Sequence, residues 1–190
     1  MSSARDQIIE ATCELLELQG YHATGLNQIV KESGCPKGSL YHYFPGGKEE
    51  LAAEAVQRVG EAVLQRIRYN LAAVDDPADA IHGFILLIAQ NVELSGFRAG
   101  GPITTVALET ASSSDHLRAV CDAIYTQWQA AFAEKLANTG VPIARARRLA
   151  ALCVTAIEGG IILCRTSRSR APLEQAAHEI GWLIEQARRA

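Results

Sequence analysis

The chain has 190 residues, enough for one or two small domains, and hydrophobic residues make up 48% of it, enough for a sizeable core. A formal net charge of −3 excludes a protein that coats nucleic acid nonspecifically, so any contact with nucleic acid has to be local. The sequence shows no signal peptide, no apolar run near the roughly 18 residues that span a bilayer, and no paired cysteine motif, which predicts a soluble, cytoplasmic protein with reduced thiols.

The first fifth of the chain predicts three short helices. Apolar residues spaced by three and four indicate a helix over residues 8–18, which Gly20 ends. A second helix over 26–33 is followed by a turn at Gly34. Proline suits the first position of a third helix, over 36–44, because its missing N–H would be unpaired there in any case.

A long helix is expected next, from Gly47 to about Val74, with acidic residues in its first turn, where they suit the helix dipole. A fifth helix starts at Pro77. The glycine-rich stretch 96–102 is a loop, and a short helix over 103–111 follows it.

Three longer helices complete the prediction, centred on residues 117–136, 149–163 and 177–187, and no strand pattern occurs. The fold class is therefore all-α, with about nine helices: a three-helix head joined by a long helix to a helical ligand-binding and dimerisation body. The expected domains are 1–63 and 64–190.

The second and third helices, with a glycine turn between them, form a helix-turn-helix pattern, which places its second helix in the major groove of DNA. Ile29, Val30 and Leu40 are the apolar positions that hold this unit together. The alternative is a plain helical hairpin whose aromatic side chains pack on one another. The residues between the apolar positions carry hydrogen-bonding or cationic groups, and they are Lys37, Ser39, Tyr41, His42 and Tyr43.

The same stretch resembles the N-terminal domain of the TetR family of transcriptional repressors, over the residues NQIVKESGCPKGSLYHYFPGGKEEL. The matching positions are Ile29, Val30, Ser33, Gly34, Cys35, Pro36, Gly38, Leu40, Tyr41, Tyr43, Phe44, Lys48 and Leu51. Pro36 departs from a serine that would cap the third helix, and Tyr43 departs from a commoner histidine. The stretch is also similar to one branch, the repressors of lincomycin-resistance exporters, which respond to flavonoid-type aromatic compounds.

The resemblance implies which residues contact an operator. Lys48, at the start of the long helix, combines a cation with free backbone N–H groups, as a phosphate contact requires, and the alternative is a solvated surface lysine. A P-loop is excluded, because its first glycine would fall at His42 and Glu49 replaces the serine or threonine after the lysine. The residues expected to contact DNA are Asn27, Lys37, Gly38, Ser39, Tyr41, His42, Tyr43 and Lys48.

The body offers a candidate site for a small hydrophobic or aromatic ligand. Three aromatic residues repeat at helical spacing on one face of the helix over 117–136, and Glu158 lies in an apolar stretch, where an unpaired charge is costly. The alternatives are that the aromatic residues fill the core and that Glu158 pairs with an arginine such as Arg165. The candidate ligand residues are Phe84, Phe97, Cys121, Tyr125, Trp128, Phe132 and Glu158.

The last two helices are apolar on more than one face, so each is expected to pack on its own body and on a second copy of the chain. The resemblance implies a homodimer built on a four-helix bundle, whose two heads read a palindrome with half-sites about 34–36 Å apart. The residues expected at this interface are Ala156, Gly160, Leu163, Ala177, Ile180, Ile184 and Ala187.

No constellation of catalytic or metal-binding residues occurs in the sequence, which predicts no enzyme activity, no metal and no cofactor. The expected function is a ligand-responsive regulator, a repressor that a small effector releases from DNA. The alternative is a small-molecule-binding or redox-sensing module that has lost operator recognition. Pro36 motivates it, together with the acidic first 50 residues, which hold seven Asp and Glu against four Lys and Arg.

Overall fold

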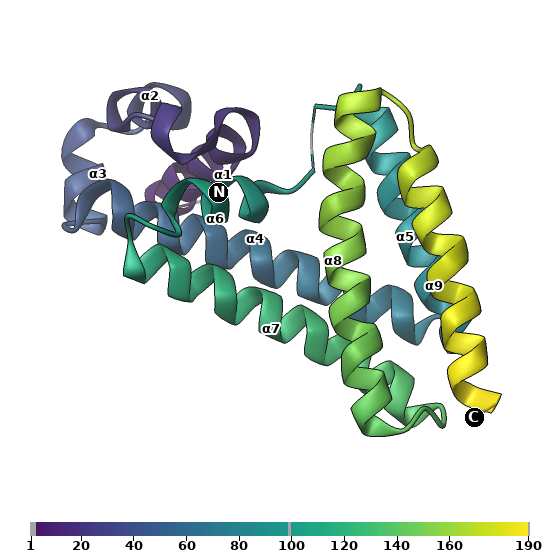
Figure 1. Cartoon of the computed structure of the whole chain (residues 1–190). Helices are drawn as coiled ribbons and strands as arrows, with labels where there is room; N and C mark the ends of the chain where they lie inside the picture. Colours follow the sequence, from purple (N-terminus) through teal and green to yellow (C-terminus); the bar gives the residue numbers. More distant parts are fainter. Residues whose placement is uncertain (1–2, 99, 190) are drawn as a thin grey trace. The chain divides into compact units, whose positions relative to one another are not determined.

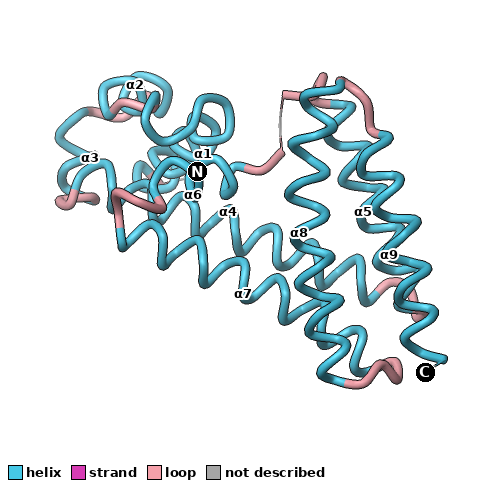
Figure 2. Tube along the Cα trace, viewed as in Figure 1, coloured by secondary structure: helices cyan, strands magenta, loops and turns pink. Residues whose placement is uncertain are grey.

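The computed structural model describes residues 3–98 and 100–189, and within them it contains nine α-helices and no strand (Figures 1 and 2). The prediction of an all-α fold is confirmed. The helices are α1 (Ala4–Ala23), α2 (Leu26–Ser33), α3 (Lys37–Tyr43), α4 (Gly47–Ala72), α5 (Pro77–Leu94), α6 (Pro102–Thr110), α7 (Asp115–Asn138), α8 (Ile143–Ser167) and α9 (Ala171–Arg189).

The helices form two compact units. The head unit comprises Met1–Glu61 and Gly101–Ile124, and the body unit comprises Ala62–Gly100 and Tyr125–Ala190. The sequence prediction grouped α6 and all of α7 with the body, whereas α6 and the first part of α7 belong to the head unit. The reason is close packing: α6 packs on α1, and a Cβ at Gly60 of α4 would lie 2.7 Å from the side chain of Ile124 of α7.

The first helix has a defined start and a break near its end. The Ser3 hydroxyl accepts a hydrogen bond from the backbone N–H of Asp6 at 3.1 Å, as an N-cap residue does. Gly20 has φ of 80°, in the left-handed region that favours glycine, and one further helical turn, Tyr21–Ala23, follows it. The sequence predicted an end at Gly20, and the structure shows a kink there instead.

The helix-turn-helix unit consists of α2 and α3. Gly34 ends α2 in the left-handed conformation, with φ of 67°, which lets the chain reverse within a few residues. Pro36 occupies the N-cap position of α3, one residue earlier than predicted, and makes no capping hydrogen bond through its side chain. Of the three apolar positions expected to hold this unit together, Ile29 of α2 and Leu40 of α3 are buried in its core, whereas Val30 is half-buried.

In the body unit, α9 packs against both α5 and α8. Figure 1 shows α8 in light green beside α9 in yellow. The two helices approach closely at Gly160, where a Cβ would lie 2.5 Å from Cδ2 of Leu173. By length and composition alone, α8 is the one described helix that could span a membrane. Its apolar face instead packs in the core of the body unit, with Cys153 and Cys164 fully buried.

Candidate DNA-binding site

Exposure divides α3 into two faces. Leu40 of α3 is 0% exposed, which confirms it as a core residue. Phe44, which directly follows α3, is also 0% exposed, whereas the Tyr41 side chain is 47% exposed. All the residues predicted to contact DNA on α2 and α3 are accessible: Asn27, Lys37, Gly38, Tyr41, His42 and Tyr43 are exposed and Ser39 is half-buried. The outer face of α3 therefore offers hydrogen-bonding, aromatic and cationic groups on a helix that its inner face holds in place.

The aromatic residues of α3 differ in their surroundings. The ring of Tyr43 lies edge-on to His42, with centroids 5.0 Å apart, and 6.5 Å from the buried ring of Phe44. Tyr43 is thus partly supported by the core, and its ring in turn supports the imidazole of His42. Among the described residues no other ring pairs with Tyr41, and its side chain is 47% exposed against 38% for Tyr43.

Lys48 lies in the first turn of α4, as predicted, but its side chain is half-buried rather than fully solvated. Its ammonium donates to the backbone carbonyl of His22 at 3.5 Å and lies 4.3 Å from the centre of the Tyr21 ring. Burial lowers the pKa of Lys48, and the negative charge of Glu109 acts in the opposite direction. Because Lys48 belongs to the first turn of α4, where backbone N–H groups have no partner within the helix, a phosphate could be bound by these N–H groups and the ammonium together.

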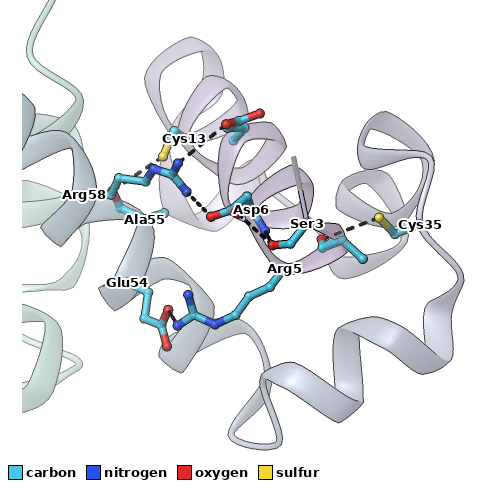
Figure 3. Close-up of polar contacts among 10 residues, drawn as sticks. Ser3, Arg5, Asp6, Cys13, Cys35, Glu54, Ala55 and Arg58 are labelled. Atoms are coloured by element: carbon cyan, nitrogen blue, oxygen red, sulfur yellow. Dashed lines mark hydrogen bonds and ion pairs between the residues drawn. The ribbon is translucent and has the colours of Figure 1, made fainter. Parts of the chain in front are cut away.

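Ion pairs tie the start of α1 to α4 (Figure 3). Arg58 of α4 pairs with Asp6 at 3.0 Å and with Glu10 at 3.6 Å, and Arg5 pairs with Glu54. The Ser3 hydroxyl and Arg58 hold the pKa of Asp6 below its usual value. Two of the seven acidic residues in the first 50 are thus balanced by an arginine outside them, so the acidic count is a poor argument against DNA binding.

Arg5 also helps to hold the end of α3 in place. Its guanidinium lies 5.5 Å from the centre of the buried Phe44 ring, at a distance that allows a cation–π interaction. Figure 3 shows the Arg5 side chain reaching Glu54 of α4, with which it forms an ion pair. The start of α1 therefore contacts both the residue that anchors α3 and the helix that carries Lys48.

The cysteines lie in surroundings that suppress their reactivity. Burial raises the pKa of Cys13 and of Cys121 to about 11 and that of Cys153 to about 12. All five thiols are free, and only Cys13 is not fully buried. The described residues contain no group of three potential metal ligands. Because the pKa is raised at Cys13, Cys121 and Cys153, the thiolate, which is the reactive form, is scarce there at neutral pH.

The candidate ligand residues fall into two groups. Phe84 and Phe132 are buried with ring centroids 6.0 Å apart, and Trp128 is also buried, so these rings contribute to the body core. Cys121 is buried in the head unit. Phe97, in the loop after α5, is half-buried and has φ of 60°, which is unusual for a residue with a side chain.

Tyr125 and Glu158 form the polar part of the candidate ligand site. The Tyr125 hydroxyl donates to a carboxylate oxygen of Glu158 at 3.4 Å, and the Tyr125 ring lies edge-on to Trp128, with centroids 5.4 Å apart. Arg165, which the sequence offered as a partner for Glu158, donates instead to the backbone carbonyl of Gly100 at 3.1 Å. Helix spacing alone did not indicate the contact between α7 and α8.

Most residues predicted at a dimer interface are buried within the chain itself. These are the inward-facing residues of α8 and α9, namely Gly160, Ala177, Ile180, Ile184 and Ala187. Ala156 is half-buried, and Leu163 is the one clearly accessible member, at 57% exposure. The large apolar side chains that these helices expose include Leu152, Ile162, Leu163 and Trp182, of which the prediction named only Leu163. The sequence did contain one indication of this exposed apolar surface: Trp182 is a large apolar residue among the polar positions of α9.

A helix-turn-helix with an exposed polar face and a lysine at the next helix N-terminus defines a DNA-binding transcriptional regulator. Residues 8–55 match the family of bacterial regulatory proteins called tetR, and residues 77–179 match the C-terminal domain described as LmrA/YxaF-like. The chain belongs to the TetR family of transcriptional regulators, and its C-terminal domain is of the LmrA/YxaF type.

Two relatives from Bacillus subtilis are similar over almost their whole length. The HTH-type transcriptional regulator YxaF is 44% identical over 96% of this chain and 96% of its own. The HTH-type transcriptional regulator LmrA is 42% identical over 90% of each. Among solved structures, a TetR regulator from Chloroflexus aurantiacus has a TM-score of 0.81 and 27% identity, covering 96% of this chain and 94% of its own. These relatives confirm the family and the branch that the sequence suggested.

Proposed function

We propose that this protein is a ligand-responsive repressor that binds a palindromic operator as a homodimer and leaves it when a small hydrophobic or aromatic effector binds. The observation that carries the proposal is the division of α3, in which Leu40 and the following residue, Phe44, are buried while Lys37, Tyr41 and His42 are exposed. A helix held this firmly on one side can present the other side to base edges and phosphates. Such a regulator acts in the cytoplasm, where the bacterial chromosome lies.

Dimerisation is supported by the outer faces of α8 and α9. Leu152, Ile162, Leu163 and Trp182 are each at least 41% exposed, and large exposed apolar side chains on neighbouring helices are typical of protein interfaces. A two-fold arrangement of two chains would present two copies of α3 to successive major grooves, about 34–36 Å apart. The expected partner on this surface is a second copy of the chain.

Effector binding is supported by the pair of Tyr125 and Glu158 in the body unit. Both side chains are half-buried, and the Tyr125 ring lies edge-on to the Trp128 ring. A carboxylate beside aromatic rings is suited to accept a hydrogen bond from a hydroxyl of an aromatic compound. In the proposed mechanism, the effector favours an arrangement of the body that binds operator less well, which is a shift between two states.

Binding of the purified protein to duplex DNA from upstream of its own gene, measured across salt concentrations, tests the proposal. We expect a clear preference over random duplex of the same length. Lys48→Ala should weaken binding to every sequence by roughly tenfold and reduce the salt slope by about one, because one phosphate contact is lost. Equal affinity for upstream and random DNA would refute the repressor function.

The same measurement tests the alternative, a small-molecule-binding module without operator recognition. Pro36 at the N-cap of α3 is the feature that still favours this alternative, because it supplies no capping oxygen. A redox-sensing version has less support, because burial raises the pKa of four of the five thiols, namely Cys13, Cys121, Cys153 and Cys164. Ligand binding to the body without any DNA preference would establish the alternative.

A further inference from the structure

The carboxylate of Glu109, on α6, contacts the last turn of α1. One Glu109 carboxylate oxygen accepts a hydrogen bond from the backbone N–H of His22 at 2.7 Å, and the Glu109 carbonyl oxygen lies 3.1 Å from Nε2 of His22. The contact requires the glycine at position 20, because a Cβ there would lie 2.2 Å from the other Glu109 carboxylate oxygen. The kink in α1 therefore creates the space that Glu109 occupies.

His22 also contacts Lys48, the lysine that we expect to bind a phosphate. The N–H of His22 is bound by Glu109, and its C=O accepts a hydrogen bond from the Lys48 ammonium at 3.5 Å. The ring of the preceding residue, Tyr21, lies beneath that ammonium, 4.3 Å away. Any movement of this turn of α1 therefore moves both groups that contact the Lys48 ammonium, the His22 carbonyl and the Tyr21 ring.

We infer that Glu109 is a positioning residue for DNA binding: by holding the turn Tyr21–Ala23, it sets where the Lys48 ammonium lies and so controls its contact with a phosphate. The inference rests on the proposed role of Lys48 and deepens it by naming the residue on α6 that controls it. α6 begins at Pro102, two residues after Gly100, whose carbonyl accepts a hydrogen bond from Arg165 of α8. A shift of α6 would thus act on Lys48 through Glu109.

The charge of Glu109 and its hydrogen bond to His22 predict opposite effects on DNA binding when Glu109 is replaced. If its negative charge only competes with a phosphate for the Lys48 ammonium, its removal strengthens DNA binding. If it positions Lys48 through the backbone of α1, removal of the acceptor oxygen weakens binding, and a neutral side chain that still accepts the hydrogen bond preserves it. The second is our expectation, because the Glu109 carboxylate accepts from the N–H of His22 and the Lys48 ammonium donates to the C=O of the same residue.

The test compares Glu109→Ala with Glu109→Gln, since both remove the charge and only Gln keeps an oxygen for the His22 N–H. Binding to the upstream duplex should be about tenfold weaker for Glu109→Ala than for Glu109→Gln. In the Lys48→Ala background, this difference should disappear to within about twofold, because residues that act through one another are not additive. Glu14→Ala, which removes a charge from an exposed position of α1, is the matched control and should bind as the unmodified protein does.

Hydrogen exchange, measured without DNA, checks the structural part separately. The His22 amide should exchange faster in Glu109→Ala than in Glu109→Gln, while the helical content and the Tm of the two variants stay close. Gly20→Ala, which displaces the Glu109 carboxylate, should reproduce both the faster exchange and the weaker binding.

The outcomes separate this inference from the function on which it rests. Equal binding by the Ala and Gln variants, tighter binding by Glu109→Ala, or a difference that persists in the Lys48→Ala background would each overturn the inference alone. If Lys48→Ala itself binds DNA as well as the unmodified protein, the proposed phosphate contact fails and the inference fails with it. A tenfold difference that vanishes without Lys48 supports it.

Discussion

The head and body units differ in how directly their sequences indicate function. In the head unit, most of the residues expected to contact DNA lie on the accessible face of α3, and Leu40 between them is buried. In the body unit, most aromatic residues expected to contact a ligand are buried, and most residues expected to contact a partner chain are buried too. A function on the outer face of a short local motif can thus be read from spacing, whereas a site built from distant helices cannot.

The two units differ because the helix-turn-helix packs residues that are close in the chain, whereas the body packs helices that are far apart in the chain. The helix-turn-helix spans residues 26–43, and the glycine at its turn leaves few ways to pack two short helices. In the body, α5 and α9 are far apart in the chain and yet pack together. Many pairings of such amphipathic helices satisfy the same periodicity, and only side-chain shape selects among them.

Removal of the buried Phe44 side chain at the end of α3 should have the largest effect on stability. Phe44→Ala leaves a cavity at a fully buried position, and we expect the free energy of unfolding to fall by about 3–5 kcal/mol. Urea unfolding at fixed protein concentration measures this, and hydrogen exchange should accelerate more in residues 1–61 than in 125–190. Tyr43→Ala, at a partly exposed neighbour, should cost less than about 1 kcal/mol. Equal costs at the two positions would show that α3 is not divided into an inner and an outer face.

Two adjacent glycines of α8 provide the matching experiment in the body unit. Gly160→Ala places a methyl group 2.5 Å from Cδ2 of the buried Leu173 and should destabilise the chain by about 1–3 kcal/mol. Gly159→Ala meets nothing within 4 Å and should stabilise the isolated chain by about 0.5–1 kcal/mol, because alanine favours a helix. Thermal unfolding measures both, and sedimentation tests whether Gly159→Ala changes the mass of the assembly. A destabilising Gly159→Ala in a monomer would contradict this assignment of faces.

His42 tests whether α3 reads bases. If its imidazole contacts a base edge, His42→Ala should reduce discrimination at one position of each operator half-site by about 1–3 kcal/mol and leave the other positions unchanged. Titration of a set of operators that differ by single base pairs measures this. Equal loss of affinity for all of them would show that His42 supports the fold or a phosphate contact, and its edge contact with Tyr43 would then be its main role.

The cysteines should give the smallest effect. Because burial raises the pKa of Cys13 and Cys121 to about 11 and of Cys153 to about 12, the thiolate fraction at pH 7.5 is lower than in an ordinary cysteine, and it grows only as the pH rises toward those values. Mild peroxide at pH 7.5 should change operator affinity by less than about twofold. Rapid alkylation of these thiols at that pH, with loss of DNA binding, would instead favour a redox sensor.

Several features of this protein could be derived from the sequence alone. The all-α class, the nine helices of the described residues and the turn at Gly34 follow from local spacing and from glycine and proline positions. The burial of Leu40 and Phe44 and the exposure of Tyr41 follow from the same spacing combined with the TetR resemblance. Helical periodicity determines these features because it specifies which side chains share one face of one helix.

Tertiary structure decided which neighbour covers each face. It placed α6 in the head unit, turned Gly160 and Ile184 inward, left Trp182 outside and joined Glu158 to Tyr125. It also brought Glu109 to the kink at Gly20, a contact between residues 87 positions apart in the chain. Periodicity is a property of one helix, whereas these contacts depend on how side chains from separate helices fit together, so no spacing within a single segment could have predicted them.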